Sequence, residues 1–261
     1  MLLAIDAGNT NIVFAVFSGK ELLGSWRALT KADRTADEHA VFLRAWLAEA
    51  GIDPVRLQSA LIGSVVPDAN FQLARLCSVY LKLQPMFIGD PRLDLGVRVK
   101  IDRPEDVGAD RLVNAAAVLA QHKPPVLIID FGTATTIDYI DAAGDYCGGV
   151  IAPGANLSLQ ALHMAAAKLP RVAMAKPPRL IGTNTVDAMQ SGIFWGYIGM
   201  LEGLVARMQD EIGRKMPVIA TGGLSSLFAT ATNLFTHRDV DLTLRGLQII
   251  YERNSGKVIE S

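Results

Sequence analysis

The sequence predicts an α/β protein made of two similar lobes with a cleft between them. Three observations favour this fold class: a strand–turn–strand pattern occurs twice, helix and strand patterns alternate around the two copies, and 50% of the residues are hydrophobic. A chain of 261 residues can form one compact body or two modest lobes. We predict a first domain over residues 1–105 and a second over residues 106–261.

The repeated pattern starts with an apolar strand that ends at an aspartate, continues through a tight turn with a glycine, and enters a second strand and a glycine hairpin. At a constant offset, Asp6 matches Asp130, Gly8 matches Gly132, Val13 matches Ile137, and Gly24 matches Gly148. Hairpins share turn glycines for generic reasons, so chance similarity is the alternative to an internal duplication.

The segments between and after the copies read as α/β units. Thr35 and Glu38 form a capping-box pattern that predicts the start of a helix ending near Gly51. By periodicity we further expect strands over 60–63, 86–88, 97–101 and 218–220, and helices over 71–81, 109–122, 157–168, 185–212 and 242–252.

The long helix predicted over 185–212 carries a face of glycines. Gly192, Gly196, Gly199 and Gly203 recur at spacings of four, three and four residues, which places them on one side. Because each costs the helix about 1 kcal/mol against alanine, we expect another backbone to pack closely there, either within the chain or across a dimer.

Composition excludes several classes of partner. The formal net charge is −1, which gives no electrostatic reason to expect nucleic acid or an anionic membrane. The N-terminus lacks the basic region of a signal peptide, so a cytoplasmic location is expected. Cys77 and Cys147 lie far apart without metal-ligand spacing, which argues against a disulfide framework or a zinc site.

The first candidate site is the turn from Asp6 to Asn11. Its glycine and short polar residues offer backbone and side-chain donors to phosphate oxygens. The Asp6 carboxylate would repel phosphate unless a cation lies between them, so we interpret Asp6 as a ligand of Mg²⁺ or of its water shell. A structural Asx-turn is the alternative.

The second candidate site, Asp130 to Thr136, repeats this geometry with threonine hydroxyls. Two such turns facing each other would make a cleft lined with donors and two carboxylates. A triphosphate bridged by cations would satisfy that cleft.

The third candidate site is Gly108-Ala109-Asp110-Arg111 at the start of a predicted helix. The helix dipole and the arginine should favour the ionised form of Asp110, which could accept a hydroxyl proton, while Arg111 could hold a carboxylate or phosphate. A helix cap with a surface ion pair is the alternative. Glycine-rich strand ends at 148–154 and 220–223 would let a flat or anionic ligand approach the backbone, with adenosine a natural occupant of the second.

Taken in order, D-x-G-N-T-N, G-A-D-R, D-F-G-T-A-T-T and G-G-x-I-x-P-G resemble the type III pantothenate kinases, a family of the acetate-kinase, sugar-kinase, Hsp70 and actin superfamily. The resemblance covers essentially the whole chain. It implies two ribonuclease H-like (actin-like ATPase) lobes and ATP-dependent phosphorylation of pantothenate to 4'-phosphopantothenate, the first step of coenzyme A biosynthesis.

The resemblance also implies roles for individual residues. Asp110 would be the catalytic base, and Asp130 would bind a monovalent cation, K⁺ or NH₄⁺, in addition to the Mg²⁺ that accompanies ATP. A homodimer is implied, with the pantothenate pocket completed near the subunit interface. ATP would be bound by Asp6, Ala7, Gly8, Asn9, Thr10, Asn11, Ile12, Val13 and Thr133, and pantothenate by Gly108, Ala109, Asp110, Arg111 and Thr185.

One position departs from the family pattern, since Ile101 stands where many members have tyrosine, which puts an aromatic or hydroxyl contact there in doubt. Two rival functions are a kinase for another small alcohol, such as a sugar, and a non-catalytic sensor that kept the nucleotide cleft. The presence of Asp6, Asp110 and Asp130 argues against the sensor.

Overall fold

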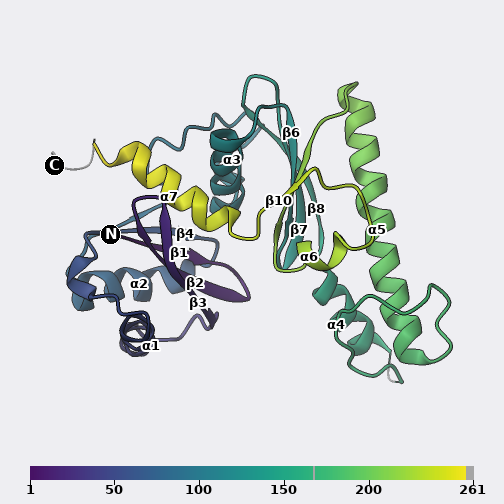
Figure 1. Cartoon of the computed structure of the whole chain (residues 1–261), viewed down its shortest axis with the longest axis horizontal. Helices are drawn as coiled ribbons and strands as arrows, with labels where there is room; N and C mark the ends of the chain where they lie inside the picture. Colours follow the sequence, from purple (N-terminus) through teal and green to yellow (C-terminus); the bar gives the residue numbers. More distant parts are fainter. Residues whose placement is uncertain (167, 257–261) are drawn as a thin grey trace. The chain divides into compact units, whose positions relative to one another are not determined.

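The computed structural model describes residues 1–166 and 168–256 (Figure 1). Contacts between Cα atoms divide the chain into two compact units. Unit 1 contains Met1–Arg98, Asp102–His122 and the segment from Leu242 onward, and unit 2 contains Val99–Ile101 and Lys123–Asp241. The predicted domain boundary at residue 105 stays a prediction; by contacts, helix α3 (Ala109–Gln121) groups with unit 1, where it packs against α7 (Leu242–Asn254).

Unit 1 is built on a five-stranded sheet in the order β3-β2-β1-β4-β5. The first three strands pair antiparallel, and β4 and β5 continue the sheet in parallel to β1. The strands are β1 (Leu2–Ala7), β2 (Asn11–Ser18), β3 (Glu21–Leu29), β4 (Ser59–Ser64) and β5 (Pro85–Phe87).

Unit 2 repeats this topology in a second five-stranded sheet, ordered β10-β9-β6-β7-β8. Again three strands pair antiparallel and two continue in parallel. These strands are β6 (Val126–Phe131), β7 (Ala134–Ile140), β8 (Tyr146–Pro153), β9 (Val218–Gly222) and β10 (His237–Arg238). The shared topology confirms the prediction of two similar α/β lobes.

The two copies differ by one residue in the turn. Asp6 pairs with Val13 across β1 and β2, whereas Asp130 pairs with Thr136 across β6 and β7. Val13 therefore corresponds to Thr136, and the constant offset that matched it to Ile137 is wrong beyond the turn, because the second turn is shorter.

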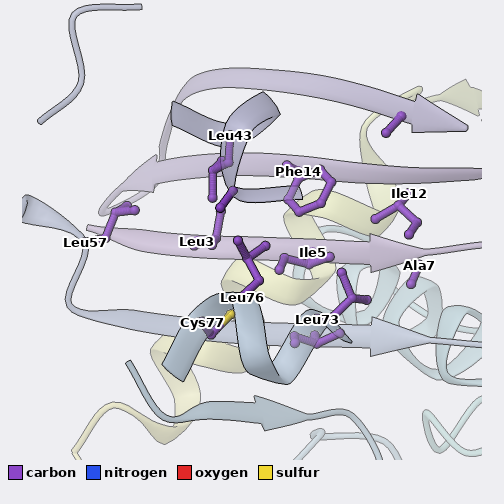
Figure 2. Packing of buried hydrophobic residues seen from close by; sticks show 14 of the residues in the cluster. Leu3, Ile5, Ala7, Ile12, Phe14, Leu43, Leu57, Leu73, Leu76 and Cys77 are labelled. Carbon is purple, nitrogen blue, oxygen red and sulfur yellow. The ribbon is translucent and has the colours of Figure 1, made fainter. Parts of the chain in front are cut away.

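The sheet of unit 1 is covered on both faces, because successive side chains of a strand point to opposite sides. Leu3 and Ile5 of β1 pack in a cluster with residues of α1 (Ala36–Glu49) and α2 (Pro67–Arg75), as Figure 2 shows. Leu2 and Ala4 pack in a second cluster with residues of α3 and α7. Figure 1 shows these two helix pairs on opposite sides of the sheet.

The helices of unit 1 begin mostly where the sequence predicts. The capping box of Thr35 and Glu38 is present at the start of α1. The helix expected over 71–81 begins earlier, since Pro67 occupies a first-turn position that suits proline, and a π-helical turn over Leu76–Tyr80 ends it.

The segment expected as a strand over 97–101 forms no strand. It makes a single bridge between Val99 and Tyr146, supported by a bond from the Lys100 N–H to the Tyr146 carbonyl at 2.8 Å. Pairing at one position is too short to define a strand. Two short 3₁₀ turns, Pro54–Arg56 and Pro104–Asp106, complete unit 1.

The core of unit 2 lies between its sheet and the long helix α5 (Thr185–Ile212). Leu127 and Ile129 of β6 cluster with Phe194 and Leu201 of α5 and with Phe228 of the short helix α6 (Ser225–Phe228). Helix α4 (Ala155–Ala165) starts close to its predicted position and ends before Lys168; residue 167 lies outside the described residues. Within residues 1–166 and 168–256, no helix is both long and apolar enough to cross a membrane.

The glycine face of α5 meets no backbone of this chain. Apart from the adjoining turns of α5 itself, a Cβ atom built at Gly192, Gly196 or Gly199 would find no atom of the described residues within 4 Å, and at Gly203 the nearest is the Arg207 Nη1 at 3.0 Å. Of the two expected explanations for these glycines, close packing against a backbone of the same chain is therefore wrong for the residues that the structure describes.

Candidate active site

The first Asp turn joins β1 to β2 and is held by its own backbone. The Gly8 N–H donates to the Asn11 carbonyl at 3.0 Å, which closes the turn and leaves the side chains of Asn9 and Thr10 exposed. Exposed short polar groups beside backbone donors suit an anionic ligand. Ala7, Ile12 and Val13 are buried, so a ligand would reach these residues through the backbone.

Thr30, which follows β3, stabilises this turn through two hydrogen bonds. Its backbone N–H donates to the Thr10 carbonyl at 2.9 Å, and its hydroxyl donates to the Gly8 carbonyl at 2.6 Å. Sequence reasoning missed Thr30, because a lone threonine after a strand carries no local signal for a contact with a turn 20 or so residues earlier in the chain.

The second Asp turn, between β6 and β7, is also closed by its glycine. The Gly132 N–H donates to the Ala134 carbonyl at 3.0 Å, and the Gly154 N–H donates to the Thr133 carbonyl at the same distance. A Cβ atom at Gly154 would lie 2.2 Å from the Thr133 oxygen. A glycine is therefore needed at position 154 so that this backbone can lie close to the turn. The sequence had suggested another reason, the close approach of a ligand.

Asp130 lies at the end of β6, between Thr136 of β7 and Thr221 of β9. A Cβ atom at Gly222, where φ is +85°, would lie 2.7 Å from the Asp130 Oδ1. Gly222, the last residue of β9, therefore leaves room for the Asp130 carboxylate and for the backbone of Phe131. Gly223, in contrast, is exposed, and a Cβ atom there would meet nothing within 4 Å.

Asp6 and the start of α3 lie on the same side of the unit 1 sheet. Leu2, Ala4 and Asp6 are each two residues apart in β1, so their side chains lie on the same face of the sheet. The side chains of Leu2 and Ala4 pack there with those of α3. The Val65 N–H donates to the Ala7 carbonyl at 3.0 Å, and the Val65 Cγ1 lies 3.5 Å from the position of a Cβ atom at Gly108. The first Asp turn and the Gly108–Arg111 segment are thus neighbours through Val65.

Asp110 stands in the first turn of α3, which begins after Gly108 without a side-chain cap. Its Oδ1 accepts the Arg111 N–H at 2.8 Å. A Cβ atom at Gly108 would lie 2.6 Å from this oxygen, so the glycine leaves space for the carboxylate.

Burial raises the pKa of Asp110 above its usual value, and this effect outweighs the Arg111 N–H and guanidinium, which lower it. The sequence-based expectation that the dipole and the arginine dominate is therefore wrong in sign, because it could not include desolvation. The structural consequence is a carboxylate with increased proton affinity, which suits a general base.

Thr185 is the first residue of α5, and Asn184 caps that helix by accepting the Asp187 N–H at 2.9 Å. Thr185 lines a cavity of about 530 Å³ together with Thr183, Leu162 and Met189. Asp6 and Asp110 belong to unit 1, whereas Asp130, Thr133 and Thr185 belong to unit 2.

Metal binding at these turns would rest on few carboxylates. Among residues 1–166 and 168–256, no group of three or more His, Cys, Asp or Glu side chains could hold a metal ion. A single carboxylate at Asp6 still fits Mg²⁺, since this ion is commonly held by one or two carboxylates together with substrate phosphates and water.

Ile101 takes an apolar role in unit 2. Its Cγ2 lies 3.5 Å from the position of a Cβ atom at Gly148. It contributes packing at the start of β8, and its side chain offers no hydroxyl.

Comparison with protein families gives a match over most of the chain. The family described as type III pantothenate kinase matches residues 2–207. A protein named type III pantothenate kinase from Paramagnetospirillum magneticum is 58% identical over 258 residues, covering 99% of each chain. One of the same name from Rhodospirillum rubrum is 54% identical, covering 97% of this chain and 99% of the relative.

Solved structures resemble the chain at low sequence identity, so the resemblance shows only that the fold is shared. A Campylobacter jejuni protein described as a Baf family transcriptional activator superposes with a TM-score of 0.61 at 20% identity, covering 97% of this chain and 99% of that one. A Sinorhizobium meliloti protein described as a 2-dehydro-3-deoxygalactonokinase gives 0.59 at 14% identity, covering 99% and 100%. Both likenesses extend over the full chain.

The half-buried carboxyl of Asp110 should cost stability at neutral pH. Its pKa is higher in the folded state than in the unfolded chain, so its contribution to stability is fully present below the unfolded pKa, about 3.9, and is lost as the pH rises through the folded pKa. We expect Asp110→Asn to keep or raise the melting temperature at pH 7, because the neutral amide keeps the acceptor for the Arg111 N–H.

Thermal unfolding of this variant can be compared with that of Asp102→Asn, a change at an exposed aspartate of unit 1, which should leave the melting temperature unaltered. A melting temperature several degrees below that of the wild type for Asp110→Asn would contradict the direction of the pKa shift.

Proposed function

The chain belongs to the type III pantothenate kinase family and phosphorylates pantothenate to 4'-phosphopantothenate, the first step of coenzyme A biosynthesis; we propose that Asp110 is the base of this transfer. As a kinase it uses ATP with a divalent metal ion. The proposal for Asp110 is carried by its placement: its carboxylate, whose pKa is raised, lies on the face of the sheet that Asp6 shares near the end of β1.

In the proposed reaction, Asp110 accepts the proton of the terminal hydroxyl of pantothenate as that oxygen attacks the γ-phosphorus. Arg111, in the next position of α3, holds the pantothenate carboxylate through its guanidinium fork. Gly108 and Ala109 line the same end of the helix. Thr185 supplies a hydroxyl at the cavity beside α5.

The phosphates of ATP are proposed to lie against the two Asp turns. The turn over Asp6–Val13 offers the exposed Asn9 and Thr10 and its backbone donors, and the second turn offers the exposed Thr133. When bound, Mg²⁺ would neutralise charge on the transferred phosphoryl group, with the Asp6 carboxylate holding it or its water. Asp130 is proposed as the ligand of a monovalent cation, K⁺ or NH₄⁺.

A homodimer is part of the same proposal. It is supported by the glycine face of α5, which no described residue of this chain covers at Gly192, Gly196 or Gly199. A helix of a second copy packed against this face would explain these glycines, because small residues let two backbones approach closely. The proposed location is the cytoplasm, where the ATP that the reaction consumes is available.

Replacing the proposed base should remove turnover without unfolding the protein. We expect Asp110→Asn to lower kcat for pantothenate phosphorylation by about 10²- to 10⁴-fold, the usual contribution of a general base. The measurement is ADP release in a coupled assay, with Asp102→Asn as the matched control. Near-normal turnover in Asp110→Asn would remove Asp110 from this role, and equal rates with sugars or other small alcohols in a substrate panel would argue for another acceptor.

The proposed cation ligand can be tested through potassium dependence. We expect turnover of the wild type to rise when K⁺ replaces a large organic cation, and Asp130→Asn to need at least about tenfold more K⁺ for half-activation, since the charge of the ligand is lost. Asp210→Asn, at an exposed position of unit 2, serves as control. An unchanged potassium response in Asp130→Asn would mean that the cation binds elsewhere.

The dimer can be tested on α5. A leucine at Gly196 would obstruct a closely packed second helix, and a Cβ atom there has open space beyond its own helix backbone. Gly196→Leu should therefore sediment as a monomer while keeping its melting temperature within a few degrees. Glu211→Leu, an exposed change beyond the glycines, should leave the assembly intact. A wild-type protein that sediments as a monomer at micromolar concentration would contradict the proposal.

A further inference from the structure

The two Asp turns have the same topology but are braced in different ways. Thr30 holds the first turn through its own hydroxyl and backbone N–H. The second turn receives the matching backbone bond from Gly154, but glycine has no hydroxyl. Helix α5 adds a contact beside the second turn, because the Tyr197 hydroxyl bonds Thr135 and Pro153, which flank it.

The Tyr197 hydroxyl contacts two groups at once. Its oxygen lies 2.8 Å from the Thr135 Oγ1, and it also hydrogen-bonds the Pro153 carbonyl. A carbonyl oxygen can only accept, and a tyrosine hydroxyl has one hydrogen. The Tyr197 hydroxyl is the donor in both bonds, so its one hydrogen is shared between the Pro153 carbonyl and the Thr135 Oγ1.

These two partners stand on either side of the turn. Thr135 pairs with Phe131 across β6 and β7, and this pair immediately flanks the Gly132–Ala134 turn. Pro153 pairs with Ala134 across β7 and β8, and the Gly154 N–H that follows it bonds the Thr133 carbonyl. One hydroxyl thus contacts both β7, which follows the turn, and the last residue of β8, whose neighbour Gly154 bonds Thr133.

The ring of Tyr197 is held independently of its hydroxyl. It stacks on Phe228 with centroids 5.3 Å apart and an angle of 17°, and Phe228 stacks in turn on Phe131 at 5.1 Å. Tyr197 and Thr135 are both buried, at 5% and 1% exposure, so water has little access to replace a lost bond. A phenylalanine at 197 could keep the stack while removing only the hydroxyl.

We propose that Tyr197 is a positioning residue for ATP: its hydroxyl fixes the backbone of the Gly132–Ala134 turn and so ties the placement of that turn to helix α5. This inference rests on the proposed role of the Asp130–Thr136 segment as the second phosphate turn. It adds a residue from α5, more than 60 positions later in the chain, to the machinery that holds the nucleotide.

The test is a comparison of Michaelis constants. Tyr197→Phe should raise KM for ATP about fivefold to tenfold, as expected for the loss of a buried hydrogen bond, while KM for pantothenate changes less than twofold. Thr135→Val should raise KM for ATP in the same direction, and Thr135→Ser, which keeps the hydroxyl, should restore it to near the wild-type value.

A structural control separates positioning from loss of stability. Val205→Ala removes buried volume from the same helix and the same core cluster, two turns beyond Tyr197, and should lower the melting temperature without changing KM for ATP. An unchanged KM for ATP in Tyr197→Phe, or an equal rise in Val205→Ala, would overturn the inference.

Thr133→Val distinguishes a failure of this inference from a failure of the proposed turn. If Thr133→Val raises KM for ATP and Tyr197→Phe does not, the turn assignment stands and the role of Tyr197 is overturned. If Thr133→Val leaves KM for ATP unchanged, the turn assignment fails and the inference fails with it.

Discussion

The antiparallel pairing of a strand that ends in aspartate with the strand that follows it is the constraint on which the site depends. The pairs Asp6 with Val13 and Asp130 with Thr136 fix each carboxylate at the end of a sheet, beside a glycine whose N–H closes the turn. Because side chains alternate along β1, the same pairing decides that Asp6 faces the side covered by α3. The placement of Asp110 near that turn follows from the packing of α3 on this face.

Glycines serve these turns in two distinct ways. Gly108 and Gly222 leave space for the carboxylates of Asp110 and Asp130, and Gly222 and Gly154 each let one backbone approach another. In each case a methyl group would lie closer than 3 Å to an oxygen, a distance that forces something to move. The exposed glycines of α5, Gly192, Gly196 and Gly199, differ from all three, since a Cβ atom there would meet open space.

Local patterns in the sequence predicted much of this structure. The duplication, the capping box at Thr35 and the long helix from Thr185 all depend on residues close together in the chain, where spacing and turn chemistry are informative. The supports of the turns could not be found in this way, because Thr30 and Tyr197 act through bonds to residues distant in sequence. The direction of the Asp110 pKa shift could not be predicted either, because it is set by desolvation, and desolvation depends on tertiary packing.

The catalytic role proposed for Asp110 is to take the proton from the hydroxyl of pantothenate. The most direct measurement is a crystal structure of the protein with pantothenate and a non-hydrolysable ATP analogue. We expect the terminal hydroxyl within about 2.6–3.2 Å of an Asp110 carboxylate oxygen, with the pantothenate carboxylate at Arg111. A complex in which the hydroxyl is bound by other groups and Asp110 lies outside hydrogen-bonding reach would contradict it.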